Sequence, residues 1–356
     1  MRFFNLKLLA LCLTLLSGPI VSSTPSGESG NDTEAVPKTS DEKHAMLDNR
    51  VLSETADAKS DQRSTQPKTT FHVTTELVVL PITVTDKNGN FVSGLRSEDF
   101  RVYENGRRQK ISFFEREDVP VTVGLIVDHS RSMEGKLPAV SSAISNFAQS
   151  SNPNDEMFVV DFSDRVWPEL FAGRLFTNNT KELEGALLSV AAQGQTALYD
   201  GVCEGLARLQ FANHQRKALI IVSDGGDNSS QHNYSDVVNW ARQSQATIYS
   251  IGLVGGPGEE EDPRALAKLS QETGGLAFFP KTVSTVKQIS EKIARDLRQQ
   301  YTIGYGPQKK TGDDAYRKIK VKVSAQGRGK LHVRTRAGYS RSAGHSLDPA
   351  AKDDVR

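Results

Sequence analysis

The stretch VGLIVDHSRSMEGK, residues 123–136, joins an apolar run to a cluster of polar side chains. Asp128, Ser130 and Ser132 stand at alternate positions directly after the apolar residues. A short apolar run of this kind is typical of a strand that is buried on both faces of a parallel sheet. A turn that leaves such a strand can direct every second side chain toward one point. The stretch therefore predicts a buried strand that ends in a polar site.

The chain around this stretch alternates between strand and helix patterns from 119 to 300. Val140, Ile144 and Phe147 recur at the spacing of one helix face, and EMFVVDFSD, KALIIVSDGG and ATIYSIGLV indicate further buried strands. Alternating strands and helices imply a mostly parallel sheet that is covered by helices on both faces. We therefore expect a doubly wound α/β domain of Rossmann-like type in this region.

The segments on either side, 69–118 and 301–340, show strand and turn patterns without helices. Turn residues at 86–89 and 104–106 separate the strands of the first segment. Each segment offers only about three strands, which is marginal for a stable sheet. We expect the two segments to pack into one small β-sandwich, from which the α/β domain is inserted.

The two ends of the chain carry different patterns. Residues 1–23 combine Arg2 and Lys7 with an apolar run and small residues, which is the order of a secretory signal peptide. An uncleaved membrane anchor is the alternative for this segment. Residues 24–68 are polar and almost free of aromatic side chains, which predicts a disordered linker, and 341–356 is expected to be a disordered tail.

The composition excludes several classes of protein. The chain has 44 Lys and Arg against 43 Asp and Glu, so it lacks the strong positive charge of a nucleic-acid-binding protein. Cys12 and Cys203 are its two cysteines, and signal cleavage would leave Cys203 alone and exclude an internal disulfide. No later segment approaches a membrane-spanning length. We expect an exported protein that is periplasmic, secreted or at the cell surface, without a transmembrane segment after cleavage.

Two further segments supply oxygen-bearing side chains. Thr196 precedes a helix pattern in AAQGQTALYDG, and Asp224 follows the strand pattern ALIIVS. Ligands of open parallel sheets collect outside the carboxyl ends of the strands, so we expect these side chains near Asp128. Two carboxylates and three hydroxyls without a suitably placed His or Cys favour a hard cation, with Mg²⁺ first and Mn²⁺ or Ca²⁺ as alternatives.

This set of residues resembles the metal-ion-dependent adhesion site of the von Willebrand factor type A (VWA) domain family. Asp128, Ser130 and Ser132 match the family's Asp-x-Ser-x-Ser motif, Thr196 matches its second loop, and Asp224 matches its third. The resemblance implies that these five residues hold the cation directly or through water. It also implies that an Asp or Glu carboxylate of another protein fills the remaining coordination position.

The resemblance to the VWA family covers about 120–300. The flanking stretches 83–114 and VRTRAGY (333–339) further resemble bacterial exported VWA-like proteins of the type abundant in acidobacteria. That narrower similarity is carried by less specific motifs than the site itself.

Simpler interpretations exist for single residues of the site. Asp and Ser are favoured helix N-caps, so the residues 128–132 alone would also fit a solvated turn. Thr196 alone would fit the N-cap of its helix, which is compatible with a metal role. Asp227 is expected to be a turn residue, and Asp200 a cap or an ion-pair partner.

Catalytic and phosphate-binding motifs fit the same stretch poorly. Adjacent residues of an extended turn point to opposite sides, so His129 is not expected to form a relay with its neighbours. The Gly-x-Ser-x-Gly elbow of hydrolases is absent here. Gly135 and Lys136 suggest a phosphate loop, but Ser130 and Leu137 stand where that pattern needs Gly and Ser or Thr. The seven histidines show no zinc-type spacing.

The C-terminal strands carry many basic residues, namely Arg317, Lys318, Lys320, Lys322, Arg328, Lys330, Arg334 and Arg336. The simplest interpretation is a solvent face whose charges keep strand edges from pairing with other chains. Contact with an anionic polysaccharide or a membrane surface is the alternative.

The sequence thus predicts an exported, non-enzymatic protein that binds a protein ligand through a divalent cation and does not bind nucleic acid. One alternative is a structural or assembly module that recruits no adhesive ligand. The other is a hydrolase that uses the cation to activate water.

Overall fold

The computed structural model describes residues 77–116, 118–169, 171–188, 190–253, 262–307 and 316–340. All of them belong to the second of two compact units, Phe71–Arg356. The expected signal peptide (1–23), linker (24–68) and tail (341–356) lie outside the described residues. Among the helices that the structure describes, none is long and apolar enough to cross a membrane.

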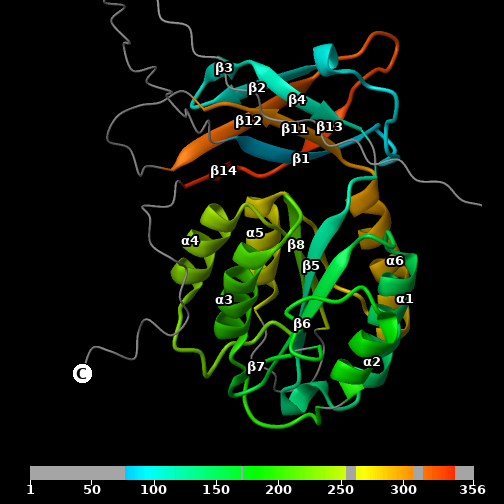
Figure 1. Ribbon diagram of the computed structural model, residues 1–356, viewed down its shortest axis with the longest axis vertical. Coiled ribbons are helices and arrows are strands. Elements are labelled where there is room, and N and C mark those ends of the chain that lie inside the picture. The colour runs from blue at the N-terminus through cyan, green and yellow to red at the C-terminus, as the bar shows by residue number, and fades with distance from the viewer. Residues whose placement is uncertain are drawn as a thin grey trace, which may run out of the picture. The chain divides into compact units, whose positions relative to one another are not determined.

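A six-stranded sheet with the order β10-β9-β8-β5-β6-β7 forms the centre of the α/β part (Figure 1). Its strands are β5 (Val121–Asp128), β6 (Glu156–Phe162), β7 (Val166–Pro168), β8 (Arg216–Ser223), β9 (Thr247–Gly252) and β10 (Ala277–Phe278). Every neighbouring pair is parallel except β6 and β7, which are antiparallel. The mostly parallel sheet that the sequence predicts is confirmed.

Helices cover both faces of this sheet, with α3, α4 and α5 on one side and α1, α2 and α6 on the other (Figure 1). The helices are α1 (Leu137–Ser150), α2 (Thr180–Leu188), α3 (Leu198–Arg208), α4 (Tyr234–Ser244), α5 (Pro263–Thr273) and α6 (Val286–Arg298). Helix α1 buries Val140, Ile144 and Phe147, the stripe expected from their spacing. The doubly wound arrangement is therefore confirmed.

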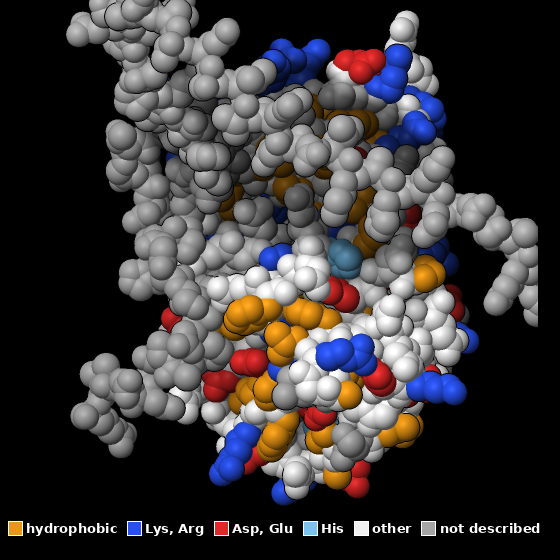
Figure 2. All heavy atoms as spheres, in the orientation of Figure 1, with side chains coloured by type: hydrophobic (Ala, Val, Ile, Leu, Met, Phe, Trp, Pro, Cys, Tyr) orange, Lys and Arg blue, Asp and Glu red, His pale blue; other side chains and the backbone are white. Residues whose placement is uncertain are grey.

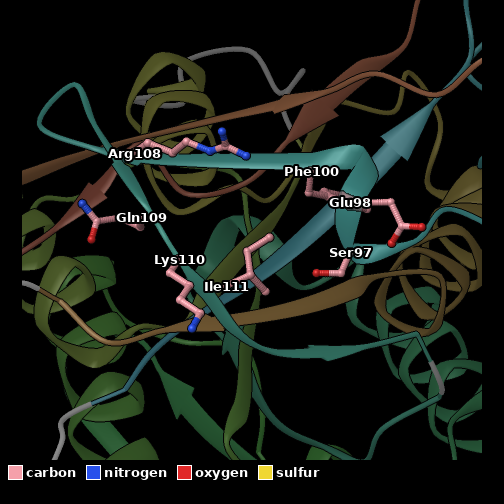
Figure 3. Close-up of a pocket in the computed structure, with 7 residues that line it drawn as sticks. All are labelled: Ser97, Glu98, Phe100, Arg108, Gln109, Lys110 and Ile111. Carbon is pink, nitrogen blue, oxygen red and sulfur yellow. The ribbon is translucent and has the colours of Figure 1, made fainter.

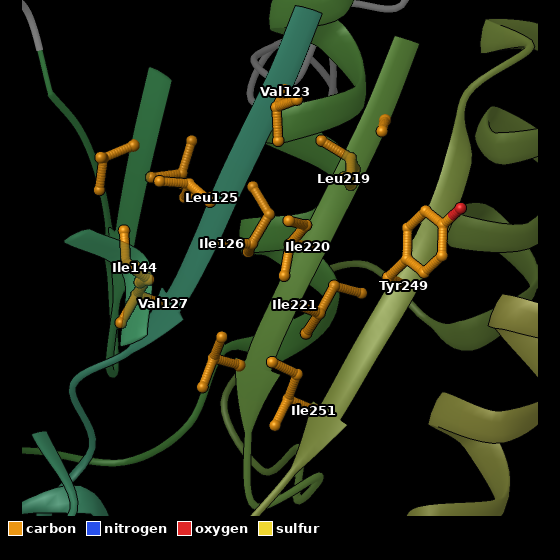
Figure 4. Packing of buried hydrophobic residues seen from close by; sticks show 14 of the residues in the cluster. Val123, Leu125, Ile126, Val127, Ile144, Leu219, Ile220, Ile221, Tyr249 and Ile251 are labelled. Carbon is orange, nitrogen blue, oxygen red and sulfur yellow. The ribbon is translucent and has the colours of Figure 1, made fainter. Parts of the chain in front are cut away.

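Strand β5 lies in the middle of the sheet, and all eight of its residues are buried. Figure 4 shows Leu125 and Ile126 of β5 beside Ile220 and Ile221 of β8, with Tyr249 of β9 beyond them. Burial of these side chains on both faces contributes roughly 25 cal/mol per Å² of apolar surface. The apolar run that opens the sequence argument is thus the central core strand.

The other described strands form two antiparallel sheets, with the orders β13-β1-β11-β4 and β14-β12-β2-β3. They are β1 (Val78–Thr85), β2 (Phe100–Glu104), β3 (Arg107–Gln109), β4 (Ile111–Glu115), β11 (Tyr301–Tyr305), β12 (Arg317–Val323), β13 (His332–Arg334) and β14 (Gly338–Tyr339). Strands from before and after the α/β part pair directly, as β1 with β11 and β2 with β12. Both sheets share one apolar core cluster. The predicted β-sandwich from the two flanks is confirmed.

The turn at 86–89 forms as expected, with the carboxylate of Asp86 accepting hydrogen bonds from the backbone of Asn88 and Asn90. This turn does not join two long paired strands, because the chain returns through a single bridge between Thr85 and Phe91. Strand β1 is instead paired with β11 and β13, whose positions in the sequence are far away.

Two basic residues that were expected on a solvent face are buried, Arg317 and Arg336. Arg336 donates hydrogen bonds to the carbonyls of Ala241 and Arg242 at the C-terminal end of α4. Such terminal carbonyls have no partner within the helix, so a buried guanidinium satisfies them and complements the helix dipole. This arginine therefore attaches the C-terminal strands to the helical layer.

Candidate metal centre

The carboxylate of Asp128 is held at the end of β5 in full burial. Its Oδ1 accepts a hydrogen bond from the backbone N–H of Ser130 at 2.8 Å, and its Oδ2 accepts one from Oγ of Ser223 at 2.6 Å. The pKa of Asp128 is raised to about 6, mainly by burial and also by the charge of Asp224, against the hydrogen bonds from Ser130 and Ser223. The strand end thus presents a desolvated carboxylate in a fixed orientation.

The two serines of the motif face each other across the turn. Oγ of Ser130 lies 3.1 Å from Oγ of Ser132, whereas Arg131 between them is exposed. A short 3₁₀ turn from Arg131 to Met133 follows, and the buried side chain of Met133 anchors it. Ser130 and Ser132 thus point to the same side of the turn and Arg131 points away, as their alternate positions in the sequence predict.

The loop that carries Thr196 lies across the first motif. The backbone N–H of Gln193 donates to the carbonyl of His129 at 2.8 Å, and that of Arg131 to the carbonyl of Gly194 at 3.5 Å. Gly194 has a φ of +75°, and a Cβ there would lie 2.7 Å from a carboxylate oxygen of Asp164. Only glycine fits this position without strain. The close approach of the Thr196 loop to the first motif therefore depends on Gly194.

The third loop closes on the second. The backbone N–H of Thr196 donates to Oδ1 of Asn228 at 2.9 Å, and the carbonyl of Thr196 accepts from the N–H groups of Asn228 and Ser229. Thr196 itself is buried, as is Asp224 at the end of β8. Hydrogen bonds thus join the Thr196 loop to both of the other loops.

Asp224 carries the second buried carboxylate of the site. Its Oδ2 lies 3.6 Å from Nζ of Lys136 and accepts no hydrogen bond among the described residues. A buried carboxylate oxygen without a hydrogen-bond donor is costly unless a cation compensates it. Lys136 supplies one positive charge to this oxygen, and the raised pKa of Asp128 beside it indicates that the two carboxylates are not fully compensated.

The structure brings Asp128, Ser130, Ser132 and Asp224 together, and it places the loop of Thr196 against the loops that carry them. Ser130 contacts Asp128 and Ser132 directly, and Asp224 lies within electrostatic range of Asp128. Thr196 is placed by the backbone bonds of its loop. The donor set is oxygen only, which fits a hard divalent cation such as Mg²⁺. No group of three or more His, Cys, Asp or Glu suited to a metal occurs in the described part of the chain.

Three residues that contribute to the site were not found from the sequence, namely Ser223, Asn228 and Lys136. Ser223 is the last residue of β8 and orients Asp128. Its role follows from the register of β5 and β8, in which Val127 lies opposite Val222. A sequence pattern identifies the two strands but not their register, so this contact had no signal in the sequence.

His129 has a structural role that the sequence interpretation did not give it. Its side chain is buried, with Nδ1 3.2 Å from Oδ1 of Asp161 on β6, and its backbone N–H donates to the carbonyl of Phe162. Burial lowers the pKa of His129, but the Asp161 carboxylate outweighs it and leaves the pKa raised. His129 therefore connects the first motif to β6 and to the Thr196 loop.

The two other carboxylates near the site bind backbone groups. Oδ1 of Asp227 accepts hydrogen bonds from the N–H of Tyr199 and from Oγ of Ser230. The carboxylate of Asp200 accepts from the backbone of Gln231 and His232. Asp227 is the turn residue that was expected, and Asp200 lies 2.7 Å from Nδ1 of His232, which agrees with the alternative of a charged partner rather than a cap. Both carboxylates fasten the third loop to α3.

Replacement of Ser223 by alanine is expected to lower cation affinity by about 10- to 100-fold, the usual effect of removing a side chain that orients a ligand. The fold should persist, because the substitution removes one hydroxyl. Calorimetric titration of Mg²⁺ measures the effect, and Ser230→Ala, which removes a hydroxyl bound to Asp227, is the matched control. Equal affinities of the two variants would contradict this role of Ser223.

The chain was compared with curated proteins, with solved structures and with family models. No curated protein matches the chain. Solved structures that it matches include a von Willebrand factor type A protein from Catenulispora acidiphila, with 13% identity, a TM-score of 0.46, and 71% of this chain and 77% of that chain covered. An aerotolerance-related membrane protein from Bacteroides fragilis gives 14% identity and a TM-score of 0.38, over 50% of this chain and 98% of that chain. A pilus adhesin from Lactobacillus rhamnosus GG gives 12% identity and a TM-score of 0.42, over 68% of this chain and 47% of that chain.

The family assignment comes from the α/β part. Residues 123–292 match the family model of the von Willebrand factor type A domain. This range contains all five residues of the candidate metal centre. The part of the chain that carries the site therefore matches the VWA domain family.

Proposed function

We propose that this chain is an exported, non-enzymatic VWA protein that binds a protein ligand through a divalent cation. Asp128, Ser130, Ser132, Thr196 and Asp224 hold the cation, directly or through water. Mg²⁺ is the expected ion, with Mn²⁺ or Ca²⁺ as alternatives. The observation that carries the proposal is the pairing of a fully buried Asp128 with an Asp224 oxygen that accepts no hydrogen bond among the described residues.

The donor set explains why such an ion would recruit a partner. VWA domains commonly bind a divalent metal at this place in the fold. Two carboxylates and three hydroxyls supply little formal negative charge, so a bound ion stays electrophilic and keeps an affinity for one more anionic oxygen. An Asp or Glu carboxylate on the surface of another protein has that chemistry.

The surroundings of the site favour binding over catalysis. VWA domains are generally non-enzymatic. A hydrolase would need a general base within hydrogen-bond reach of an activated water. The nearest imidazole in sequence, that of His129, is buried and lies against Asp161 rather than against the serine hydroxyls.

Export and domain division belong to the same proposal. The pattern of 1–23 supports a signal peptide, and periplasmic, secreted or cell-surface placement follows from it. In this division 119–300 is the VWA domain, and 69–118 with 301–340 form the sandwich that carries it.

The proposal predicts cation-dependent capture of a partner. The full chain is immobilised and exposed to a native envelope or culture extract, with Mg²⁺ and with chelator, beside Asp128→Asn. A partner should be recovered only by the wild type with Mg²⁺, and its binding should compete with an excess of acetate or an Asp-containing peptide. Equal recovery in all conditions would overturn the proposal.

Two other outcomes distinguish the alternatives. Turnover of ester or phosphate substrates that disappears in Asp128→Asn would favour a hydrolase. Stabilisation by Mg²⁺ without recovery of any partner would favour an assembly module.

A further inference from the structure

The sheet with the order β14-β12-β2-β3 presents a row of cations on its outer side, which we call the basic face. Along β12 the burial alternates, so that Lys318, Lys320 and Lys322 are exposed. Arg101 on β2 and Arg108 on β3 are exposed as well. In Figure 2, Lys and Arg side chains lie along the upper edge of the view, on either side of a cluster of acidic side chains.

The strand register places these cations on one face. Lys322 lies opposite Arg101, and Lys320 lies opposite Tyr103, which in turn lies opposite Arg108. Directly opposed residues of antiparallel strands share a face of the sheet. The cations thus cover three adjacent strands, over about 13 Å along β12 and about 10 Å across the strands.

This charge is not balanced within the sheet. The single acidic residue in β2, β3 and β12 is Glu104, which is buried on the inner side against Arg317. Among the described residues, none of the five cations of the basic face forms an ion pair. Like charges directly opposite one another, such as Lys322 and Arg101, destabilise a sheet. Nζ of Lys322 lies 5.7 Å from the centre of the Tyr103 ring, but this contact does not neutralise its charge. An arrangement of like charges that costs stability and is not neutralised among the described residues indicates an external partner.

Protection of strand edges does not account for the basic face. Charges that prevent unwanted pairing belong on edge strands. Strands β12 and β2, which supply four of the five cations, are the two inner strands of the sheet. Arginines with a structural role, Arg317 and Arg336, point inward and are buried. The outward cations are therefore a separate set.

The pocket beside this face does not define a small-anion site. The pocket has a volume of about 620 Å³. Arg108 of β3 and Lys110, which connects β3 to β4, line one side of it, and Ser97 and Glu98 line the other (Figure 3). The carboxylate of Glu98 opposes an anion there. Arg108 is shared by the pocket and the basic face, whereas the other four cations lie on the open sheet surface outside the pocket.

We propose that the basic face docks on an anionic lipid bilayer. The face is the surface of a β-sheet that carries five cations and one half-buried tyrosine, Tyr103. The cations are spread over an open sheet surface of about 13 Å by 10 Å rather than along a groove, which favours a planar bilayer over a polymer chain. Lysines and arginines near an anionic bilayer each raise partitioning about fivefold, and salt weakens the effect. This inference does not depend on the cation site.

The test uses the full chain, chelator, and vesicles of neutral phosphatidylcholine with or without about one-third phosphatidylglycerol. The wild type should sediment with the anionic vesicles and be released by high salt. The triple variant Lys318→Gln, Lys320→Gln, Lys322→Gln should partition about 100-fold less, which is fivefold for each charge. The matched control Lys181→Gln, Lys281→Gln, Lys287→Gln removes three exposed lysines of the α/β part and should bind as the wild type does.

Three results would overturn the proposal. They are equal binding of the two triple variants, equal binding to neutral and anionic vesicles, and no binding of the wild type to anionic vesicles. Retention on a carboxylated polysaccharide together with no vesicle binding would replace the bilayer by a polymer. Because chelator is present throughout, failure of this proposal is distinguishable from failure of the cation site.

Discussion

Asp128→Asn is expected to abolish the stabilisation of the protein by Mg²⁺. At a cation concentration of 100 times Kd, the wild type should gain about 2.7 kcal/mol in the free energy of unfolding. For a chain of this size that corresponds to a rise in Tm of roughly 5–10 °C. Asparagine keeps the shape of the side chain but removes the charge that attracts the ion. A thermal melt with Mg²⁺ and with chelator measures both states.

In the metal-free state, Asp128→Asn should be at least as stable to unfolding as the wild type. The pKa of Asp128 is raised in the fold from 3.8 to about 6, mainly by burial. A group whose pKa is raised by folding favours its protonated form, so its ionised form destabilises the fold at neutral pH. Asparagine removes that cost, and Asp128→Asn should melt no lower than the wild type in chelator. This result separates loss of the ion from loss of the fold.

Asp227→Asn is the matched control, because the same substitution is made three residues beyond Asp224 at a carboxylate that binds Tyr199 and Ser230. It should keep the response to Mg²⁺. A cation response in Asp128→Asn as large as in this control would show that Asp128 does not hold the ion.

Glu104→Ala is expected to destabilise the sandwich by about 3–5 kcal/mol, the usual cost of leaving a buried charge without its partner. Oε1 of Glu104 lies 2.7 Å from Nη1 of Arg317, and Oε2 accepts hydrogen bonds from the hydroxyls of Tyr305 and Tyr339 at 2.8 and 2.9 Å. All four residues are buried. Glu104 lies before the VWA domain and its three partners after it, so this cluster joins the two flanks.

Unfolding in urea followed by circular dichroism measures the loss. Glu98→Ala is the control, because Glu98 forms an exposed ion pair with Arg96 in the same part of the chain. Surface pairs contribute little, and this variant should change stability by less than about 1 kcal/mol. The double variant Glu104→Leu, Arg317→Met removes both charges and should recover part of the loss. Similar stabilities of Glu104→Ala and Glu98→Ala would contradict a shared core.

The sequence predicts the layers of the fold because apolar periodicity reports which faces are buried. The apolar run before Asp128 predicts strand β5, and the spacing of Val140, Ile144 and Phe147 predicts helix α1. The sandwich follows from a size argument, since neither flank has enough strands for a stable sheet. Export, the linker and the tail concern residues outside those described, and they stay predictions.

The register of the strands and the burial of polar side chains were harder to predict. Ser223 reaches Asp128 through strand register, which no local pattern encodes. Arg317 and Arg336 alternate with apolar residues as surface charges do, yet they are buried because a carboxylate and a helix end compensate them. His129 lacks every motif of a functional histidine, and its role depends on the position of Asp161 in a neighbouring strand.

The central claim is that one cation is held by Asp128, Ser130, Ser132, Thr196 and Asp224. Titration of the metal-free full chain with Mn²⁺, followed by electron paramagnetic resonance of the free ion, counts the bound ions directly. We expect one saturable Mn²⁺ per wild-type chain, displaced by Mg²⁺, and none in Asp128→Asn or Asp224→Asn. Saturable binding of one ion that is unchanged in both variants, or no saturable binding in the wild type, would contradict the account.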